Sequence, residues 1–231
     1  GLDQRSGILA DGTYGQRALN AITGKGWWIG RPIELPSSRP LRLEHGNIGS
    51  QLIDWPLEHV VKCLVFYHPD DPAALRAEQD ALLLEVWQAC NKSGHELLLE
   101  VILPENGPDK DERHYHTMLE HFYQLGIKPD WWKLPPLSSA SWQQITALIE
   151  REDPWSRGIL ILGLDAPSDK LRAGFAEAAA HPMIKGFAVG RTIFGQPSRR
   201  WMQGELSDEA LIEEVKHNYL TLIGYWREAR R

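Results

Sequence analysis

The sequence is poor in cysteine, lacks long apolar runs and has fewer basic than acidic residues, and each of these features excludes a class of protein. Two cysteines in 231 residues are too few for a small secreted domain held together by disulfides. No apolar run approaches the length of a transmembrane helix, and no signal peptide is visible. A net charge of −6 argues against a general polyanion binder. We therefore expect a cytoplasmic protein that binds neither nucleic acid nor membrane.

Motifs for common cofactors and metals are also missing. No GxGxxG sequence follows a predicted strand, which argues against a dinucleotide site. In HYHTMLEH, His114 and His116 do not share a helix face, and we interpret them and His121 as histidines on a helix surface. We expect no cofactor and no bound metal. Cys63 and Cys90 fall in a predicted strand and a predicted helix, and we interpret both as buried, reduced, small apolar residues.

Short apolar segments alternate with amphipathic stretches along the chain. Strands that are apolar on both faces, with helices between them, are typical of parallel βαβ units in an α/β protein. An open doubly wound sheet and a (β/α)8 TIM barrel both fit, and seven such units favour a barrel that lacks its first strand in this chain. We expect an irregular insertion over 31–56 and a polar loop over 104–111. The predicted strands are 7–11, 26–30, 60–67, 96–103, 130–134, 158–164 and 185–190, and the predicted helices are 72–94, 111–126, 138–152, 168–181 and 207–231.

Three of the predicted strands contain an ionisable residue among apolar ones. Lys62 interrupts VVKCLVFY, Glu100 interrupts ELLLEVIL, and Lys133 ends DWWKL before two prolines. A buried charge is costly unless it is paired or neutral, so this placement points to a function. A lysine whose pKa is lowered by burial and a nearby cation can attack a carbonyl carbon, and Glu100 could carry protons. These are the parts of Schiff-base aldol chemistry, although a structural Lys–Glu salt bridge remains the alternative.

The last two predicted strands end in glycines that precede helices, in GILILGLDAPSD and KGFAVGRTIFG. In barrels the loops after the last two strands commonly hold phosphate, using backbone N–H groups and a helix N-terminus. Gly163, Gly190 and Arg191, which adds a forked donor, are therefore candidate phosphate ligands. Two tight turns and an arginine paired with a surface acid would give the same pattern.

Two further candidates follow the first two predicted strands. Asp11, in LADGTYG, could orient a lysine or a substrate hydroxyl group, or it could cap a helix. Arg31, in WWIGRPIE, could reach a carboxylate or phosphate group of a substrate. Neither pattern distinguishes a binding residue from a structural one.

The segments VVKCLVFYHPDD, LLLEVILPE, DWWKLPP and GFAVGRTIF resemble, in this order, class I aldolases of the tagatose-1,6-bisphosphate aldolase type. The resemblance implies a metal-independent aldehyde-lyase in which Lys133 forms the Schiff base, Glu100 is the acid–base group and Lys62 assists. ADGTYGQRALNAITGKGWWIGRPIELPSSRPL and HPMIKGFAVGRTIFGQPSRRW are similar to one domain of bifunctional 5-dehydro-2-deoxygluconokinase/aldolase proteins of myo-inositol catabolism. In those proteins this domain follows the sugar kinase.

The second resemblance implies cleavage of 2-deoxy-5-keto-D-gluconate 6-phosphate to dihydroxyacetone phosphate and malonate semialdehyde. It also implies that residues 1–231 are one aldolase-like barrel domain of a longer protein with a kinase domain upstream, and it leaves a homo-oligomer possible. The alternatives are a non-catalytic sugar-phosphate-binding domain that regulates an attached kinase and a lysine-containing isomerase on the same scaffold. Which lysine forms the Schiff base stays open if both face the interior.

Overall fold

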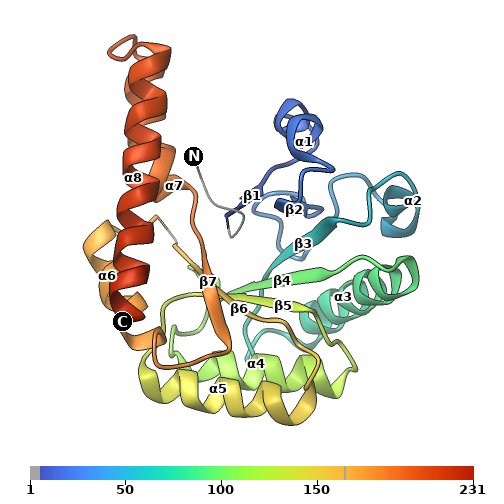
Figure 1. Ribbon diagram of the computed structural model, residues 1–231. Coiled ribbons are helices and arrows are strands. Elements are labelled where there is room, and N and C mark those ends of the chain that lie inside the picture. Colours follow the sequence, from blue (N-terminus) through green and yellow to red (C-terminus); the bar gives the residue numbers. More distant parts are fainter. Residues whose placement is uncertain (1–5, 164) are drawn as a thin grey trace. The chain divides into compact units, whose positions relative to one another are not determined.

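The computed structural model describes residues 6–163 and 165–231, so the last residue of the strand predicted over 158–164 lies outside the described residues. Parallel strands alternate with helices in these ranges (Figure 1). The predicted strands are confirmed to within two residues at each end. They are β1 (Gly7–Leu9), β2 (Trp28–Pro32), β3 (His59–Phe66), β4 (Leu97–Ile102), β5 (Trp131–Leu134), β6 (Gly158–Leu162) and β7 (Ile184–Ala188).

Five helices match the predicted ranges to within three residues, and three others had no predicted range. The last of the five begins after Ser207, whose hydroxyl group accepts a hydrogen bond from the N–H of Ala210. The first unpredicted helix has only seven residues and no side-chain cap, so it lacks the usual start signal. The helices are α1 (Gln16–Ile22), α2 (Ile48–Leu52), α3 (Ala73–Ser93), α4 (Arg113–Gln124), α5 (Ser139–Glu152), α6 (Ser168–Ala178), α7 (Arg191–Met202) and α8 (Asp208–Ala229).

The strands follow one another in the sheet in chain order, from β1 to β7. The pairs β1–β2, β2–β3, β3–β4 and β6–β7 are parallel. Parallel strands in chain order with helical connections are the arrangement of a (β/α)8 barrel. The predicted fold class is therefore confirmed, with seven strands in the described part of the chain.

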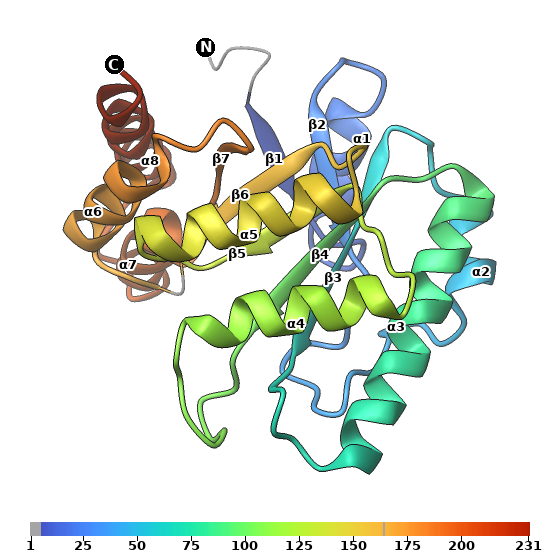
Figure 2. The ribbon, with the colours of Figure 1, turned by 90° about the horizontal axis from the view of Figure 1, so that it is seen from below.

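The chain forms two compact units. The first unit is Gly1–Trp132 with Leu148–Arg157, and the second is Lys133–Ala147 with Gly158–Arg231. Figure 2 shows α3 and α4 of the first unit lying along the same side of β3 and β4. In the second unit α8 packs against α6 and α7 (Figure 1).

Contacts in the first unit distinguish the two faces of its strands. Tyr67, directly after β3, donates a hydrogen bond of 2.9 Å to Asp80 of α3, and its ring packs on Phe122 of α4. This face of β3 is therefore covered by helices. Because successive side chains of a strand point to opposite faces, Lys62 lies on the other face.

That other face is the inside of a curved sheet. Trp28 of β2 and Trp131 of β5 meet edge to face with their ring centroids 6.1 Å apart. The two strands are three places apart in the sheet order, so the sheet must curve for these side chains to touch. Trp28 also shares its face with Pro32, the residue opposite Lys62. We call this face the interior face.

Residues 31–56 are more ordered than we expected from the sequence. Strand β2 runs to Pro32, and Glu34 and Leu43 form an isolated antiparallel bridge. Helix α2 follows, with the side chain of Asn47 as its N-cap. The prediction of an irregular insertion is therefore wrong for Arg31, Pro32 and α2, whereas 33–47 contain neither helix nor strand apart from this bridge.

Two local predictions are confirmed. Cys63 and Cys90 are buried and have free thiol groups. Residues 104–111 contain neither helix nor strand. Separately, no helix in the described ranges is both long enough and apolar enough to cross a membrane.

Candidate active site

Lys62 is a buried ammonium group between two carboxylates. Its Nζ lies 2.8 Å from Glu100 Oε2 and also donates a hydrogen bond to Glu34 Oε1. Only 8% of Lys62 and 4% of Glu100 are exposed. Burial lowers the pKa of Lys62, but the carboxylates of Glu100 and Glu34 raise it further, and the net shift is upward. Lys62 is therefore protonated at neutral pH.

The strand register explains why these three side chains meet. Lys62 lies opposite Pro32 of β2 and Leu98 of β4. Glu34 comes two residues after Pro32, and Glu100 comes two residues after Leu98. Both acids therefore lie nearer the carboxyl ends of their strands than Lys62 does. Residues two apart share a face of a strand, so the long side chain of Lys62 reaches both acids on the interior face.

The sequence analysis missed Glu34, although a signal for it was present. The segment RPIELP was assigned to the insertion over 31–56, because the predicted strand ended at Gly30. Glu34 nevertheless continues the alternation of β2 by two residues, which puts it on the face of Lys62. Its Oε1 binds Lys62, whereas its Oε2 is buried and has no hydrogen-bond partner among the described residues.

Lys133 lies in β5 and is 7% exposed. The residue before it, Trp132, points to the helices, because its indole N–H donates a hydrogen bond of 2.9 Å to Tyr123 and its ring stacks on Phe122 of α4. Alternation along β5 therefore gives Lys133 the same face as Trp131, which is the interior face. The sequence prediction that Lys133 ends an apolar strand is consistent with this placement.

In the second unit, the loops after β6 and β7 lie against each other. The hydroxyl group of Thr192 donates a hydrogen bond of 2.9 Å to the carbonyl oxygen of Ala166. A Cβ atom added at Gly163 would lie 2.8 Å from Cγ1 of Val189, so only glycine fits this contact without a shift. The two predicted phosphate loops are thus neighbours.

Gly190 is the N-cap of α7, and Arg191 is the first residue of that helix. The guanidinium of Arg191 is exposed and lies 3.9 Å from the carboxylate of Asp165. The pairing with a surface acid that the sequence left open is therefore present. Phosphate binding by Gly163, Gly190 and Arg191 stays a prediction.

Asp11 and Arg31 both have structural partners. The carboxylate of Asp11 accepts hydrogen bonds from the backbone N–H groups of Thr13 and Tyr14, so it caps the turn before α1. Burial raises the pKa of Asp11, but these N–H groups lower it further and the net shift is downward. The guanidinium of Arg31 lies 4.1 Å from the ring centre of Trp55, on the face opposite Pro32. Substrate contacts of Asp11 and Arg31 stay predictions.

The histidines of α4 are half-buried rather than fully on the surface. His114 Nε2 lies 2.5 Å from Asp109, and the buried His68 contacts the same carboxylate at 3.4 Å. Ligand atoms of His68, Asp70 and His114 lie within 4.8 Å of one another. However, the backbone N–H of Asp70 donates to His68 Nδ1, which leaves the proton on Nε2, directed at Asp109. Hydrogen bonds therefore account for this cluster.

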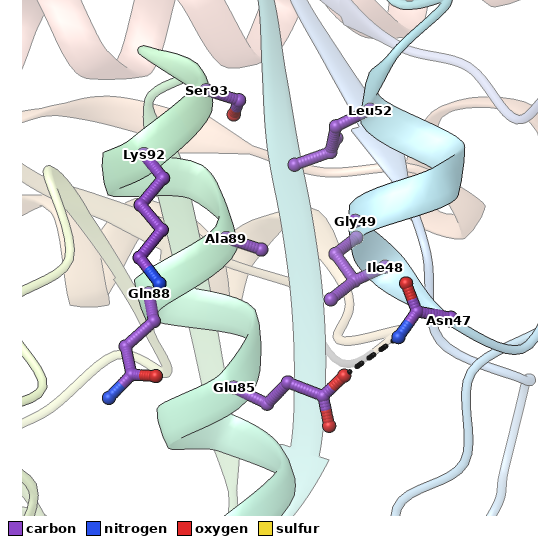
Figure 3. A pocket seen from close by; sticks show the side chains of 9 residues that line it. All are labelled: Asn47, Ile48, Gly49, Leu52, Glu85, Gln88, Ala89, Lys92 and Ser93. Carbon is purple, nitrogen blue, oxygen red and sulfur yellow. Dashed lines mark hydrogen bonds between the residues drawn. The ribbon is translucent and has the colours of Figure 1, made fainter.

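A hollow on the helical side of the first unit lies between α2 and α3 (Figure 3). Asn47 donates a hydrogen bond of 3.2 Å to Glu85 across it, and Leu52 contributes an apolar wall. None of the site residues predicted from the sequence lines this hollow. It is therefore separate from the Glu34–Lys62–Glu100 cluster.

Comparison with solved structures shows the fold. A fructose-bisphosphate aldolase from Plasmodium falciparum matches with a TM-score of 0.63 and 10% identity, over 92% of this chain and 71% of that chain. The fructose-bisphosphate aldolase of Slackia heliotrinireducens matches with a TM-score of 0.61 and 10% identity, over 91% of this chain and 72% of that chain. A Schiff-base-forming fructose-1,6-bisphosphate aldolase matches with a TM-score of 0.54 and 12% identity, over 81% of this chain and 71% of that chain. At these identities the likeness shows a shared fold.

The sequence itself was compared with curated proteins and with family models. None of the curated proteins matched it. One family model, described as "Uncharacterized protein conserved in bacteria (DUF2090)", matches residues 1–230. With nearly the whole length matched, the chain belongs to this bacterial family, and it has the fold of Schiff-base-forming aldolases.

Proposed function

We propose that this chain is a class I aldolase, in which Lys133 forms a Schiff base with a phosphorylated keto acid and Glu100 transfers protons. The observation that carries the proposal is the buried Glu34–Lys62–Glu100 cluster on the interior face of a parallel sheet. Isolated charges are rarely buried without a function or a partner. The aldolase fold of the solved relatives supports the same reading, as analogy.

The contacts of Lys62 support Lys133 as the reactive amine. Attack on a carbonyl carbon requires an uncharged amine, and the two carboxylates beside Lys62 keep it protonated. Lys62 then serves as a fixed positive charge that holds the Glu100 carboxylate in one orientation. Lys133, two residues after Trp131 in β5, therefore takes the nucleophilic role in this proposal.

The proposed reaction has four steps. Nζ of Lys133 adds to the ketone carbon and water leaves, which gives a positively charged Schiff base. The bond between the α- and β-carbons of the Schiff base breaks, and its electron pair moves through the α-carbon to the Schiff-base nitrogen, which gives an enamine. Glu100 accepts the proton of the hydroxyl group that becomes the aldehyde. A proton then returns to the carbon that was cleaved, and water releases the ketone product from Lys133.

We propose 2-deoxy-5-keto-D-gluconate 6-phosphate as the substrate, and dihydroxyacetone phosphate and malonate semialdehyde as the products. The sequence resemblance supports this choice. For the phosphate group we propose the loops at Gly163 and Gly190 with Arg191. The support is that the two loops adjoin and that α7 begins at Arg191, where unpaired N–H groups favour an anion.

A cleavage assay tests this proposal. Dihydroxyacetone phosphate released from the proposed substrate is measured by a coupled, NADH-dependent reduction. We expect cleavage that EDTA does not reduce, and a loss of at least about a thousandfold in kcat for Lys133→Met, because no other group replaces the amine. Lys185→Met, at an exposed lysine of the second unit, is the control and should keep full activity.

Two results would contradict the proposal. Tight binding of the substrate without cleavage would instead support a regulatory binding domain. Loss of activity in EDTA would indicate a metal-dependent reaction.

A further inference from the structure

One carboxylate oxygen of Glu34 has no hydrogen-bond partner among the described residues. Glu34 Oε1 accepts a hydrogen bond from Lys62, but Oε2 is buried without any hydrogen-bond partner in the described ranges. The side chain of Glu34 is 9% exposed. Buried polar atoms are nearly always hydrogen-bonded, so this oxygen is available to a donor from outside the protein.

Backbone hydrogen bonds on both sides of Glu34 hold its main chain in place. Before Glu34, the N–H of Ile33 donates a hydrogen bond of 3.0 Å to the carbonyl oxygen of Lys62. After it, the N–H of Leu35 donates one of 2.8 Å to the carbonyl oxygen of Arg42. Lys62 also holds Oε1, so the ion pair sets the direction of Oε2.

The charge of the Glu34 carboxylate limits which chemical group can donate a hydrogen bond to Oε2. An ionised carboxylate oxygen such as Glu34 Oε2 can only accept hydrogen bonds. A buried negative charge repels phosphate and carboxylate groups, whereas a hydroxyl group donates to it without adding charge. A neutral hydroxyl group therefore fits Oε2.

We propose that Glu34 Oε2 accepts a hydrogen bond from a substrate hydroxyl group beside the carbon–carbon bond that is cleaved. This inference rests on the proposed aldolase function. Lys62 contacts both Glu34 and Glu100, so the two acids act on neighbouring groups. If Glu100 takes the proton of the hydroxyl group that becomes the aldehyde, Glu34 binds the hydroxyl group on the next carbon. That hydroxyl group stays on the ketone product, and Glu34 is a specificity-determining residue for it.

Two ketones that differ in this hydroxyl group test the inference. Dihydroxyacetone phosphate carries it, and acetol phosphate has a hydrogen atom in its place. Each is added at the same subsaturating concentration, the Schiff base is reduced with borohydride, and the adduct is measured by mass spectrometry. We expect the wild-type protein to favour dihydroxyacetone phosphate by about tenfold to a hundredfold. In Glu34→Leu this preference should fall to near one.

The preference is a ratio measured on one protein sample, so loss of folded protein in a variant does not change it. Glu34→Gln, which keeps the shape but not the charge, should give an intermediate preference. Glu44→Gln, at a half-buried acid of the same segment, should give the wild-type preference.

The outcomes separate the two claims. Adducts that form with an equal preference in the wild type and in Glu34→Leu would overturn the role of Glu34 and leave the aldolase intact. Failure of the wild type to form an adduct with either ketone would overturn both.

Discussion

Among single residues, Lys62 and Lys133 differ in what their surroundings imply. Both are buried, and both lie on the interior face of their strands. Lys62 is held by Glu34 and Glu100, which keep it charged and exclude it as a nucleophile. In the sequence Lys62 lies within its predicted strand and Lys133 ends its own, and the resemblance implied different roles for them. The contacts of Lys62 add a physical reason for that difference.

Replacing Lys62 tests the buried cluster through stability. Lys62→Met leaves two carboxylates without their cation, which we expect to lower the free energy of unfolding at pH 8 by about 3–5 kcal/mol. Lys92→Met, at an exposed lysine of α3, should change it by less than about 0.5 kcal/mol. Urea denaturation of the three proteins measures these differences. Equal stability of Lys62→Met and the wild type would contradict the ion pairs.

The raised pKa of Lys62 also sets the sign of a pH effect. A lysine whose pKa is higher in the folded than in the unfolded state contributes its full stabilisation below the unfolded value of about 10.4. The contribution is lost only as pH rises through the folded value. Between pH 7 and 9 the wild type should therefore lose no stability through Lys62, which urea denaturation at several pH values checks.

Among elements, the contact between the loops after β6 and β7 depends on a glycine. Gly163→Ala brings a Cβ atom to within 2.8 Å of Val189, and we expect a loss of about 1–3 kcal/mol in the free energy of unfolding. At Gly186 of β7 the nearest side-chain atom, from Leu160, is 4.0 Å from an added Cβ. Gly186→Ala should therefore be tolerated, and equal urea midpoints for the two variants would contradict the account.

The same loops allow a test of phosphate binding. Arg191→Met should raise KM for the phosphorylated substrate by about tenfold to a hundredfold, because a charged hydrogen bond to phosphate is lost, and change kcat little. Its exposed pair with Asp165 contributes little stability. Arg172→Met, which breaks an exposed pair with Glu228 in the same unit, is the control and should leave KM unchanged. An unchanged KM in Arg191→Met would remove this residue from the site.

At the scale of the whole molecule, the sequence predicted the fold better than the site. Pro72 and Gly94 flank α3 and made that helix easy to find, and strands buried on both faces predicted a parallel sheet. Glu34 was missed because the predicted strand ended at Gly30, whereas β2 runs to Pro32. The register that joins Lys62 to Glu34 and Glu100 depends on how whole strands pair, which no local pattern encodes.

The shared fold of this chain and the Schiff-base-forming aldolases does not by itself establish the reaction. The central claim is that one particular lysine bonds covalently to a ketone. The most direct measurement is borohydride reduction with dihydroxyacetone phosphate, followed by peptide mass spectrometry to locate the modified residue. The account predicts one adduct, on Lys133, and none on Lys62; modification of Lys62, or of no lysine at all, would contradict it.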